Sequence, residues 1–195
     1  MSKKSFYGIG YNSKGRHKTS VNGTHTSAYR AWRNMLMRCY CPKYHARQPT
    51  YAGCTIADEW RNYQDFGNWF EGHEYSHHGY QLDKDLLLPN NKVYAPDLCV
   101  FVPQELNSLL LDCGAARGQY PQGVSFHKNA NKFNARIAIN GKRQQHLGYF
   151  DTELEAYQAY KIAKEANVKR MALEWRDDIA ANVYEALMRW SLDSK

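Results

Sequence analysis

Three strand-like segments followed directly by a helical segment, all within residues 123–167, constrain the fold of this chain more than any other feature. The segments GVSFHK, KFNARIAI and GKRQQHLGYF are separated by Asn/Gly turns. In the second segment, apolar residues alternate with largely polar ones, as in a strand with one buried face. The apolar set is Phe133, Ala135, Ile137 and Ile139. The pattern predicts a three-stranded antiparallel sheet whose apolar face must be covered.

The segment TELEAYQAYKIAKEAN can provide that cover. Thr152 and Glu155 form a capping box, which marks the start of a helix. The residues that then recur with helical spacing are Ala156, Ala159, Tyr160 and Ala163. Because alanines let a helix lie close to a sheet, we expect an α+β fold in which one helix packs on three antiparallel strands.

The face of the sheet that the helix leaves free is predicted to be polar and basic. A two- or three-stranded ribbon fits the major groove of duplex DNA, where Arg binds guanine and Asn or Gln binds adenine. Lysines beside the ribbon can contact phosphates. The candidate DNA-binding residues are Ser125, His127, Lys128, Lys132, Asn134, Arg136, Lys142, Arg143 and Gln145. The alternative is a sheet that packs on protein.

The distribution of charge also indicates a polyanionic partner. The net charge is +7. Residues 1–27 carry five Lys/Arg and residues 120–150 carry another five, and neither stretch contains an acid. Residues 28–112 are nearly neutral, with eight basic and ten acidic side chains. Charge needed only for solubility would not avoid acids at these two places, so nucleic acid is the favoured partner.

The sequence shows no membrane or export signal. No apolar run reaches the roughly 18 residues of a membrane helix. The start, MSKKSFYGIG, lacks the apolar core of a signal peptide. We therefore expect a soluble cytoplasmic protein with no membrane contact.

The rest of the chain is predicted to form four further parts. Residues 1–25 are a basic arm, either extended against the body or disordered until it binds. Residues 26–113 form an aromatic-rich module, and residues 114–122 are a Gly-rich linker. Residues 168–195 hold a C-terminal helix, which could also mediate a homodimer.

Helical spacing of apolar residues predicts three helices within the aromatic-rich module. They lie in TSAYRAWRNMLMRCY, in DEWRNYQDFGNWFEG and in PQELNSLLLDC. On the first of them, Arg30 and Arg33 lie beside Tyr29 and Trp32, and these arginines could contact phosphate or stack on bases. A solvated helix surface is the alternative.

The cysteines allow a metal site without requiring one. There are five, an odd number, with no C-x-x-C spacing. A zinc site built from Cys39, Cys41, Cys54 and Cys99 is conceivable, and buried free thiols are the simpler interpretation.

The predicted sheet and its helix resemble a known domain. The segments GVSF, KFNARIAINGK and LGYFDTELEAYQAYKIAKE resemble the plant ethylene-response-factor type of DNA-binding domain, which also occurs in phage proteins. The last segment agrees best with that family. Phe133 stands where the family has Trp, and the strands carry fewer arginines. The resemblance implies DNA recognition by the sheet and leaves the target sequence open.

A wider pattern resembles phage-encoded HNH-type homing endonucleases, which often end in the domain just described. It runs through YRAWRNMLMRCY, EW, LDKDLL and NKVYAPDLCVFVPQELN. In an HNH site, a β-hairpin and the following helix hold one divalent ion. The resemblance implies that Asp83 and Asn107 are metal ligands, with Mg²⁺ the expected ion. It implies that Asn90 or Asn91 pins the hairpin loop and that Lys84 stands in the position of the general base.

Lysine is a poor match for that base. Its free pKa is about 10.4, so roughly one side chain in a few thousand is neutral at pH 7. Lys84 could instead clamp a phosphate, and Asp85 could brace the site or add a carboxylate. The candidates for a replacement base are His73, His77 and His78. Asp83 and Asp85 could also be a charged pair that merely flanks a turn.

Together these patterns predict a sequence-recognising protein that binds double-stranded DNA. The leading expectation is a homing-type endonuclease that hydrolyses phosphodiesters with a divalent metal. The alternative is a relative that has lost its base and acts as a transcriptional repressor. A third, weaker interpretation is a structural protein that binds another protein through its aromatic surface.

Overall fold

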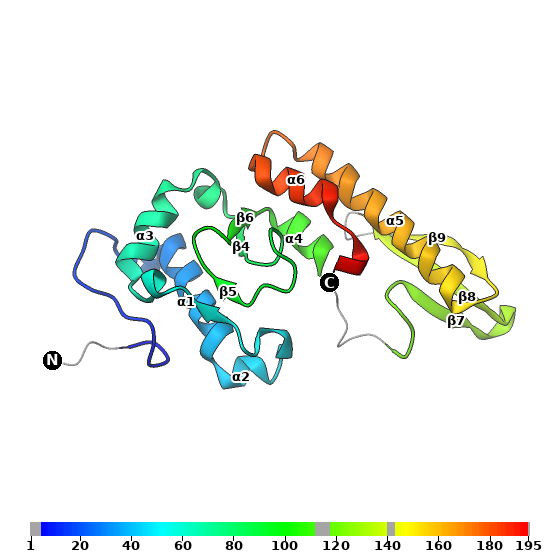
Figure 1. The fold of residues 1–195 in the computed structure, drawn as a ribbon, viewed down its shortest axis with the longest axis horizontal. Helices are drawn as coiled ribbons and strands as arrows, with labels where there is room; N and C mark the ends of the chain where they lie inside the picture. Colours follow the sequence, from blue (N-terminus) through cyan, green and yellow to red (C-terminus); the bar gives the residue numbers. More distant parts are fainter. Residues whose placement is uncertain (1–4, 112–117, 140–142, 195) are drawn as a thin grey trace. The chain divides into compact units, whose positions relative to one another are not determined.

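The chain has a mixed α+β fold made of two compact units, residues Met1–Pro103 and Gln104–Lys195 (Figure 1). The structure is a computed structural model that describes residues 5–111, 118–139 and 143–194. The division falls before α4 (Gln104–Leu110), a helix that the sequence pattern groups with residues 26–113.

The core of the first unit forms around α1 (Ser27–Tyr40) and α3 (Tyr63–Gly72) (Figure 1). The apolar stripe predicted on α1 is buried, and Trp32 is 0% exposed. Its indole N–H donates to the backbone carbonyl of Trp60 at 2.7 Å. The largest side chain of the helix therefore enters the core with its one polar atom paired.

The helix predicted over DEWRNYQDFGNWFEG is interrupted. A 3-10 turn, η2 (Asp58–Arg61), comes first, and α3 starts two residues later. Asn62 separates them because its side chain accepts a hydrogen bond from the Gln64 backbone N–H and caps α3. The break leaves Trp60 buried on the same core as the residues of α3.

Short elements complete the first unit. Two pairs of strands are antiparallel. They are β1 (Ser20–Val21) with β2 (Thr24–His25), and β4 (Gln81–Asp83) with β6 (Val100–Val102). A third pair, β3 (Thr55–Ile56) with β5 (Val93–Tyr94), is parallel. The short helices are α2 (Pro42–His45), η1 (Pro49–Tyr51) and η3 (Glu74–His78).

The N-terminal arm is ordered against this unit from residue 5 onward. Phe6 meets Trp32 edge-on, with ring centroids 5.4 Å apart. The backbone N–H of His17 donates to the Gln64 side chain at 2.9 Å, and His17 is buried. Of the two alternatives for the arm, the structure therefore has the one in which it contacts the body.

The second unit contains the predicted sheet of three antiparallel strands, in the order β7-β8-β9 (Figure 1). The strands are β7 (Val124–His127), β8 (Lys132–Ile139) and β9 (Arg143–Phe150), with the 3-10 turn η5 (Lys128–Ala130) after β7. Along one face runs α5 (Glu153–Glu174), which begins at the predicted capping box and extends seven residues past the predicted end at 167.

Close packing of α5 on the sheet depends on a glycine. Gly123 has φ +78°, and a Cβ at this position would lie 2.0 Å from Cδ2 of Tyr160. Tyr160 belongs to the cluster of buried residues that also includes Ile137. Any larger residue at 123 would push α5 away from the sheet.

The C-terminal helix α6 (Ala181–Arg189) packs on α5 and is followed by η6 (Leu192–Ser194). Of its predicted apolar stripe, Ile179, Val183 and Leu187 are buried, and Trp190 is partly buried. The stripe thus has a partner within its own unit. Across the described ranges, no helix is long and apolar enough to cross a membrane.

The buried contact of α6 predicts a difference between two leucines. Leu187 is 0% exposed and Leu173 is 54% exposed. Leu187→Ala should lower the free energy of unfolding by about 2–5 kcal/mol, because it removes buried methyl groups and leaves a cavity. Leu173→Ala, the matched control, should change it by about 0.5 kcal/mol or less. Urea denaturation monitored by circular dichroism measures both. Equal effects would contradict the packing of α6.

Candidate functional site

The strand register identifies the face of the sheet that α5 leaves free. Residues paired across antiparallel strands point to the same face. Asn134 is paired with Ser125 on one side and with Tyr149 on the other, and Arg136 is paired with His146. Arg136, Ser125 and His146 are exposed. The free face below means Ser125, His127, Lys132, Asn134, Arg136, Gln144, His146 and Tyr149.

A β-bulge in β9 decides which residues reach the free face. Ala135 pairs with Gly148, whereas the next residue of β8, Arg136, pairs with His146, so Leu147 has no partner. His146 and Tyr149 are three residues apart and yet share a face, with ring centroids 4.8 Å apart. Simple alternation cannot predict this, and both residues were missed in the sequence.

The predicted contact Gln145 lies on the other face of β9, because it pairs with Ile137, which faces α5. The backbone of Arg143, also a predicted contact, pairs with Ile139. Gln145 is exposed, because β9 is an edge strand. The register thus places Gln144, not Gln145, beside Arg136. Lys142, also a predicted contact, lies outside the described residues.

The free face offers hydrogen-bonding groups without a carboxylate, since residues 124–150 contain no acid. Arg136 and Lys128 are exposed. The Nδ1 atom of His127 accepts from the Ala130 backbone N–H at 3.2 Å. In the neutral ring, Nε2 therefore carries the proton and is a donor. Lys132 differs, because its Nζ lies 3.0 Å from Asp151 Oδ1 at the end of the sheet.

Asn134 lies beneath the free face and is 2% exposed. Its Nδ2 donates to Ser125 Oγ at 3.4 Å, and its partner on the neighbouring strand β9 is Tyr149. Within the described part of the chain, Asn134 Oδ1 has no hydrogen-bond partner. Asn134 is therefore placed to position its neighbours more than to reach a ligand directly.

The hairpin of the first unit joins β4 to β6, and Asp83 ends its first strand. One carboxylate oxygen of Asp83 accepts the backbone N–H groups of Asp85, at 2.8 Å, and Leu86, at 2.7 Å. Burial raises the pKa of Asp83 above its ordinary value, although these two hydrogen bonds lower it. The side chain that the resemblance makes a metal ligand is thus already the cap of a tight turn.

Lys84 points into the unit and is 5% exposed. Its Nζ donates to Asp85 Oδ1 at 2.5 Å and to the Asn91 backbone carbonyl at 2.6 Å. The ammonium also lies about 6 Å from the ring centroids of Tyr51 and Tyr94. Lys84 is thus held by a carboxylate and a carbonyl inside the unit, whereas a general base must be free to take up a proton.

Asn91 pins the loop between the two strands, the role that the resemblance implies. It is 7% exposed. Its Nδ2 donates to the carbonyls of Lys84, at 2.8 Å, and Val93, at 2.7 Å. Its Oδ1 accepts the Val93 backbone N–H at 2.9 Å. Asn90, the other candidate, is exposed and has a left-handed φ of 62°.

The hairpin side chains do not fit a divalent metal site in this arrangement. Asp83 is engaged by two backbone N–H groups, and the Asp85 carboxylate faces the Lys84 ammonium, which supplies positive charge where a metal ion would. Asn107 lies on α4, in the second unit, so its pairing with Asp83 stays a prediction. In residues 5–111, 118–139 and 143–194, no group of three or more His, Cys, Asp or Glu could hold a metal ion.

The upstream histidines differ in burial. His73 caps α3, and its ring lies 4.9 Å from that of Phe101. Burial lowers the pKa of His73, so that its neutral form is favoured near neutral pH. His77 and His78 lie on η3 and are exposed. None of the three is shown to serve the hairpin, and the replacement base stays a prediction.

The four described cysteines are free thiols. Cys39, Cys54 and Cys99 are buried in the core of the first unit. Burial raises the pKa of Cys39 and Cys99 to about 12, so both stay protonated near neutral pH. Cys41 lies near the surface, and a hydrogen bond from the Tyr44 backbone lowers its pKa. Cys39, Cys54 and Cys99 thus behave as core residues, and Cys113 lies outside the described residues.

Comparisons with family models, with curated proteins and with solved structures gave no significant match to this chain.

The burial of Asp83 predicts that removing its charge stabilises the protein, by an amount that depends on pH. Because the folded-state pKa is raised, the ionised carboxylate is disfavoured in the folded protein, and stability falls as pH rises through that pKa. Asp83→Asn keeps an oxygen for the turn and should unfold at equal or higher urea concentration than the wild type at pH 7. The difference should shrink as pH falls toward 4.

Asp83→Ala is the matched control. It removes the acceptor and should cost about 1–3 kcal/mol, because two backbone N–H groups of the turn lose their partner. Urea midpoints at pH 4, 5.5 and 7 measure both variants. A higher urea midpoint for the wild type than for Asp83→Asn at pH 7 would contradict this prediction, because it would show that the charge of Asp83 stabilises the fold.

Proposed function

We propose that this chain is a sequence-recognising protein that binds double-stranded DNA through the free face of the β7–β9 sheet. The observation that carries the proposal is the composition of this face. Its exposed side chains are hydrogen-bond donors and acceptors, one arginine stands at its centre, and no acid occurs in residues 124–150. Such a surface attracts a polyanion and presents groups that can distinguish base pairs.

The chemistry of the face assigns different tasks to its side chains. Arg136 can bind guanine through two N–H groups, and Gln144 can bind adenine in the same bidentate manner. His146 and Tyr149 add an aromatic edge and further donors. Lys128, beyond the end of β7, would contact a phosphate. The combination is that of a ribbon inserted into a major groove.

The hairpin supports a binding role more than a cutting role. Lys84 is engaged as a buried cation, and Asp83 as a turn cap. We infer that the first unit acts as a scaffold and a second contact surface, so the chain would bind DNA without hydrolysing it. A transcriptional repressor is a protein of this kind.

A metal-dependent homing-type endonuclease is the second candidate. One observation favours it: Asn91 ties the loop between β4 and β6 with three hydrogen bonds, as the resemblance to HNH nucleases implies. Residues Asp83 and Asn107 would then hold a divalent ion such as Mg²⁺. For that arrangement, Asp83 would have to give up its hydrogen bonds to the turn or bind the ion through its second carboxylate oxygen.

Binding through the sheet predicts a strong dependence on salt. About five phosphate contacts give a slope near −4 to −5 in a plot of log K against log salt concentration. Fluorescence anisotropy with a labelled duplex measures it. A flat plot would favour a protein partner instead.

Arg136→Ala should weaken binding to a selected target by about 1–3 kcal/mol and weaken binding to unrelated duplex much less. Lys169→Ala, an exposed change on α5, is the matched control and should alter the affinities for target and for unrelated duplex only slightly. The target is obtained beforehand by selection from random duplexes. Equal losses on target and unrelated DNA would contradict base reading by Arg136.

Nicking of supercoiled plasmid separates the two candidates. With Mg²⁺ or Mn²⁺, the protein should leave the plasmid intact while still retarding it on a gel. Nicking that is abolished by Asp83→Ala would instead establish the endonuclease. The stability of that variant, measured as above, controls for unfolding.

A further inference from the structure

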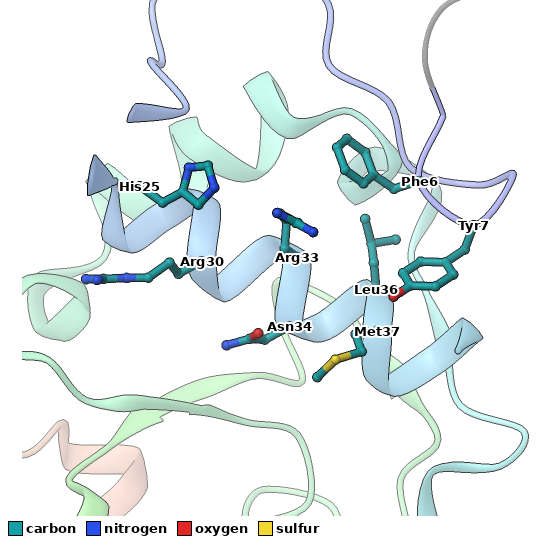
Figure 2. A pocket seen from close by; sticks show the side chains of 8 residues that line it. All are labelled: Phe6, Tyr7, His25, Arg30, Arg33, Asn34, Leu36 and Met37. Carbon is teal, nitrogen blue, oxygen red and sulfur yellow. The ribbon is translucent and has the colours of Figure 1, made fainter. Parts of the chain in front are cut away.

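A cavity in the first unit lies between the N-terminal arm and α1 (Figure 2). Its volume is ≈ 210 Å³. This is below the roughly 300–1,000 Å³ of pockets for drug-sized ligands. A ligand of this size has about one planar ring system and a small polar group.

The floor of the cavity is apolar and partly aromatic. Leu36 and Met37 contribute from α1, and Phe6 and Tyr7 contribute from the arm. Leu36 is 0% exposed and closes the floor. Tyr7 is 47% exposed at the mouth of the cavity (Figure 2). A flat apolar ring that entered would therefore meet aromatic and aliphatic surface.

Tyr7 is held in an unfavourable backbone conformation. Its φ is 55°, in the left-handed region, where a bulky residue is uncommon. Strain of this kind persists only where surrounding structure enforces it, and it concentrates at functional positions. Gly8, with φ 74°, shows that glycine accommodates the same turn without strain. The strained tyrosine places an aromatic ring at the mouth of the cavity.

The other wall is cationic. Arg30, Arg33 and Asn34 of α1, together with His25 of β2, line it (Figure 2). The Arg33 guanidinium lies 5.4 Å from the ring centroid of Phe6. Among the described residues, no carboxylate pairs with Arg30 or Arg33, and no Asp or Glu lines the cavity. Unneutralised guanidinium groups beside an apolar floor suit an anion attached to an aromatic ring.

A second cavity of ≈ 240 Å³ adjoins the first and shares Arg30 and Asn34 with it. Its lining also lacks acids and includes Arg38. Ser76 also lines it, and the buried Oγ atom of Ser76 has no hydrogen-bond partner in the described structure. Both cavities thus present polar and cationic residues of α1 without an acid among their lining residues.

We propose that α1 and the arm form a site for one unpaired nucleotide, with its base on Phe6 and Tyr7 and its phosphate on Arg30 and Arg33. The site deepens the proposed function and rests on it, because it names a feature of the DNA that the sheet does not read. The outside of a paired duplex offers sugars and phosphates to the arginines and leaves the apolar floor empty. An extrahelical or single-stranded nucleotide fills both parts.

The test compares two duplexes of identical sequence, one fully paired and one with a single unpaired nucleotide, by fluorescence anisotropy. The readout is the ratio of their affinities. The wild type should bind the second duplex about tenfold more tightly, the effect of stacking one base. Tyr7→Gly, which removes the ring and relieves the strained backbone, and Arg33→Gln should bring the ratio close to one. Arg47→Gln, an exposed change beyond α2, should leave it intact.

A ratio of one for the wild type would overturn the site, as would an unchanged ratio in Tyr7→Gly and Arg33→Gln. If paired DNA does not bind at all, the proposed function fails. The site then stands only if a single-stranded oligonucleotide binds and both variants abolish its binding. Calorimetry with a nucleoside monophosphate and with inorganic phosphate separates the contribution of the base to binding from that of the phosphate. Equal binding of the two would overturn the role of the base.

Discussion

The contact between α5 and one face of the β7–β9 sheet is the constraint on which the second unit depends. A three-stranded sheet has two faces, and only one can be covered by a single helix. Gly123 allows Tyr160 to come close enough for that cover to be tight. Because α5 covers the apolar residues of β8, the opposite face is left for hydrogen-bonding side chains. This is the face on which a ligand can be recognised.

The loop between β4 and β6 in the first unit is held by an asparagine and a buried lysine. The loop between β4 and β6 is tied by Asn91, as a nuclease hairpin would require, yet Lys84 brings a fixed positive charge beside Asp85. A lysine in this position satisfies the carboxylate and a backbone carbonyl at once. The hairpin can thus remain a stable structural element whether or not it ever holds a metal ion.

The sequence predicts those parts of the fold that depend on local patterns. Alternation in KFNARIAI and the capping box at Thr152 correctly placed β8 and the start of α5. The membership of the free face could not be predicted from alternation, because the bulge at Leu147, beside Gly148, shifts the register of β9 by one residue. The inward direction of Lys84 could not be predicted either. One partner, Asp85, is its neighbour in the sequence, but the Asn91 carbonyl and the rings of Tyr51 and Tyr94 come near it only in the folded unit.

The bulge in β9 has a consequence for the chemistry of this surface. Without the bulge, regular pairing of the same strand would place Leu147 opposite Arg136 and Gln145 opposite Ala138. His146 and Gln144 would then turn to the face that α5 covers. The chemistry that the sheet exposes is therefore set by one extra residue in β9 as much as by the identities of the side chains.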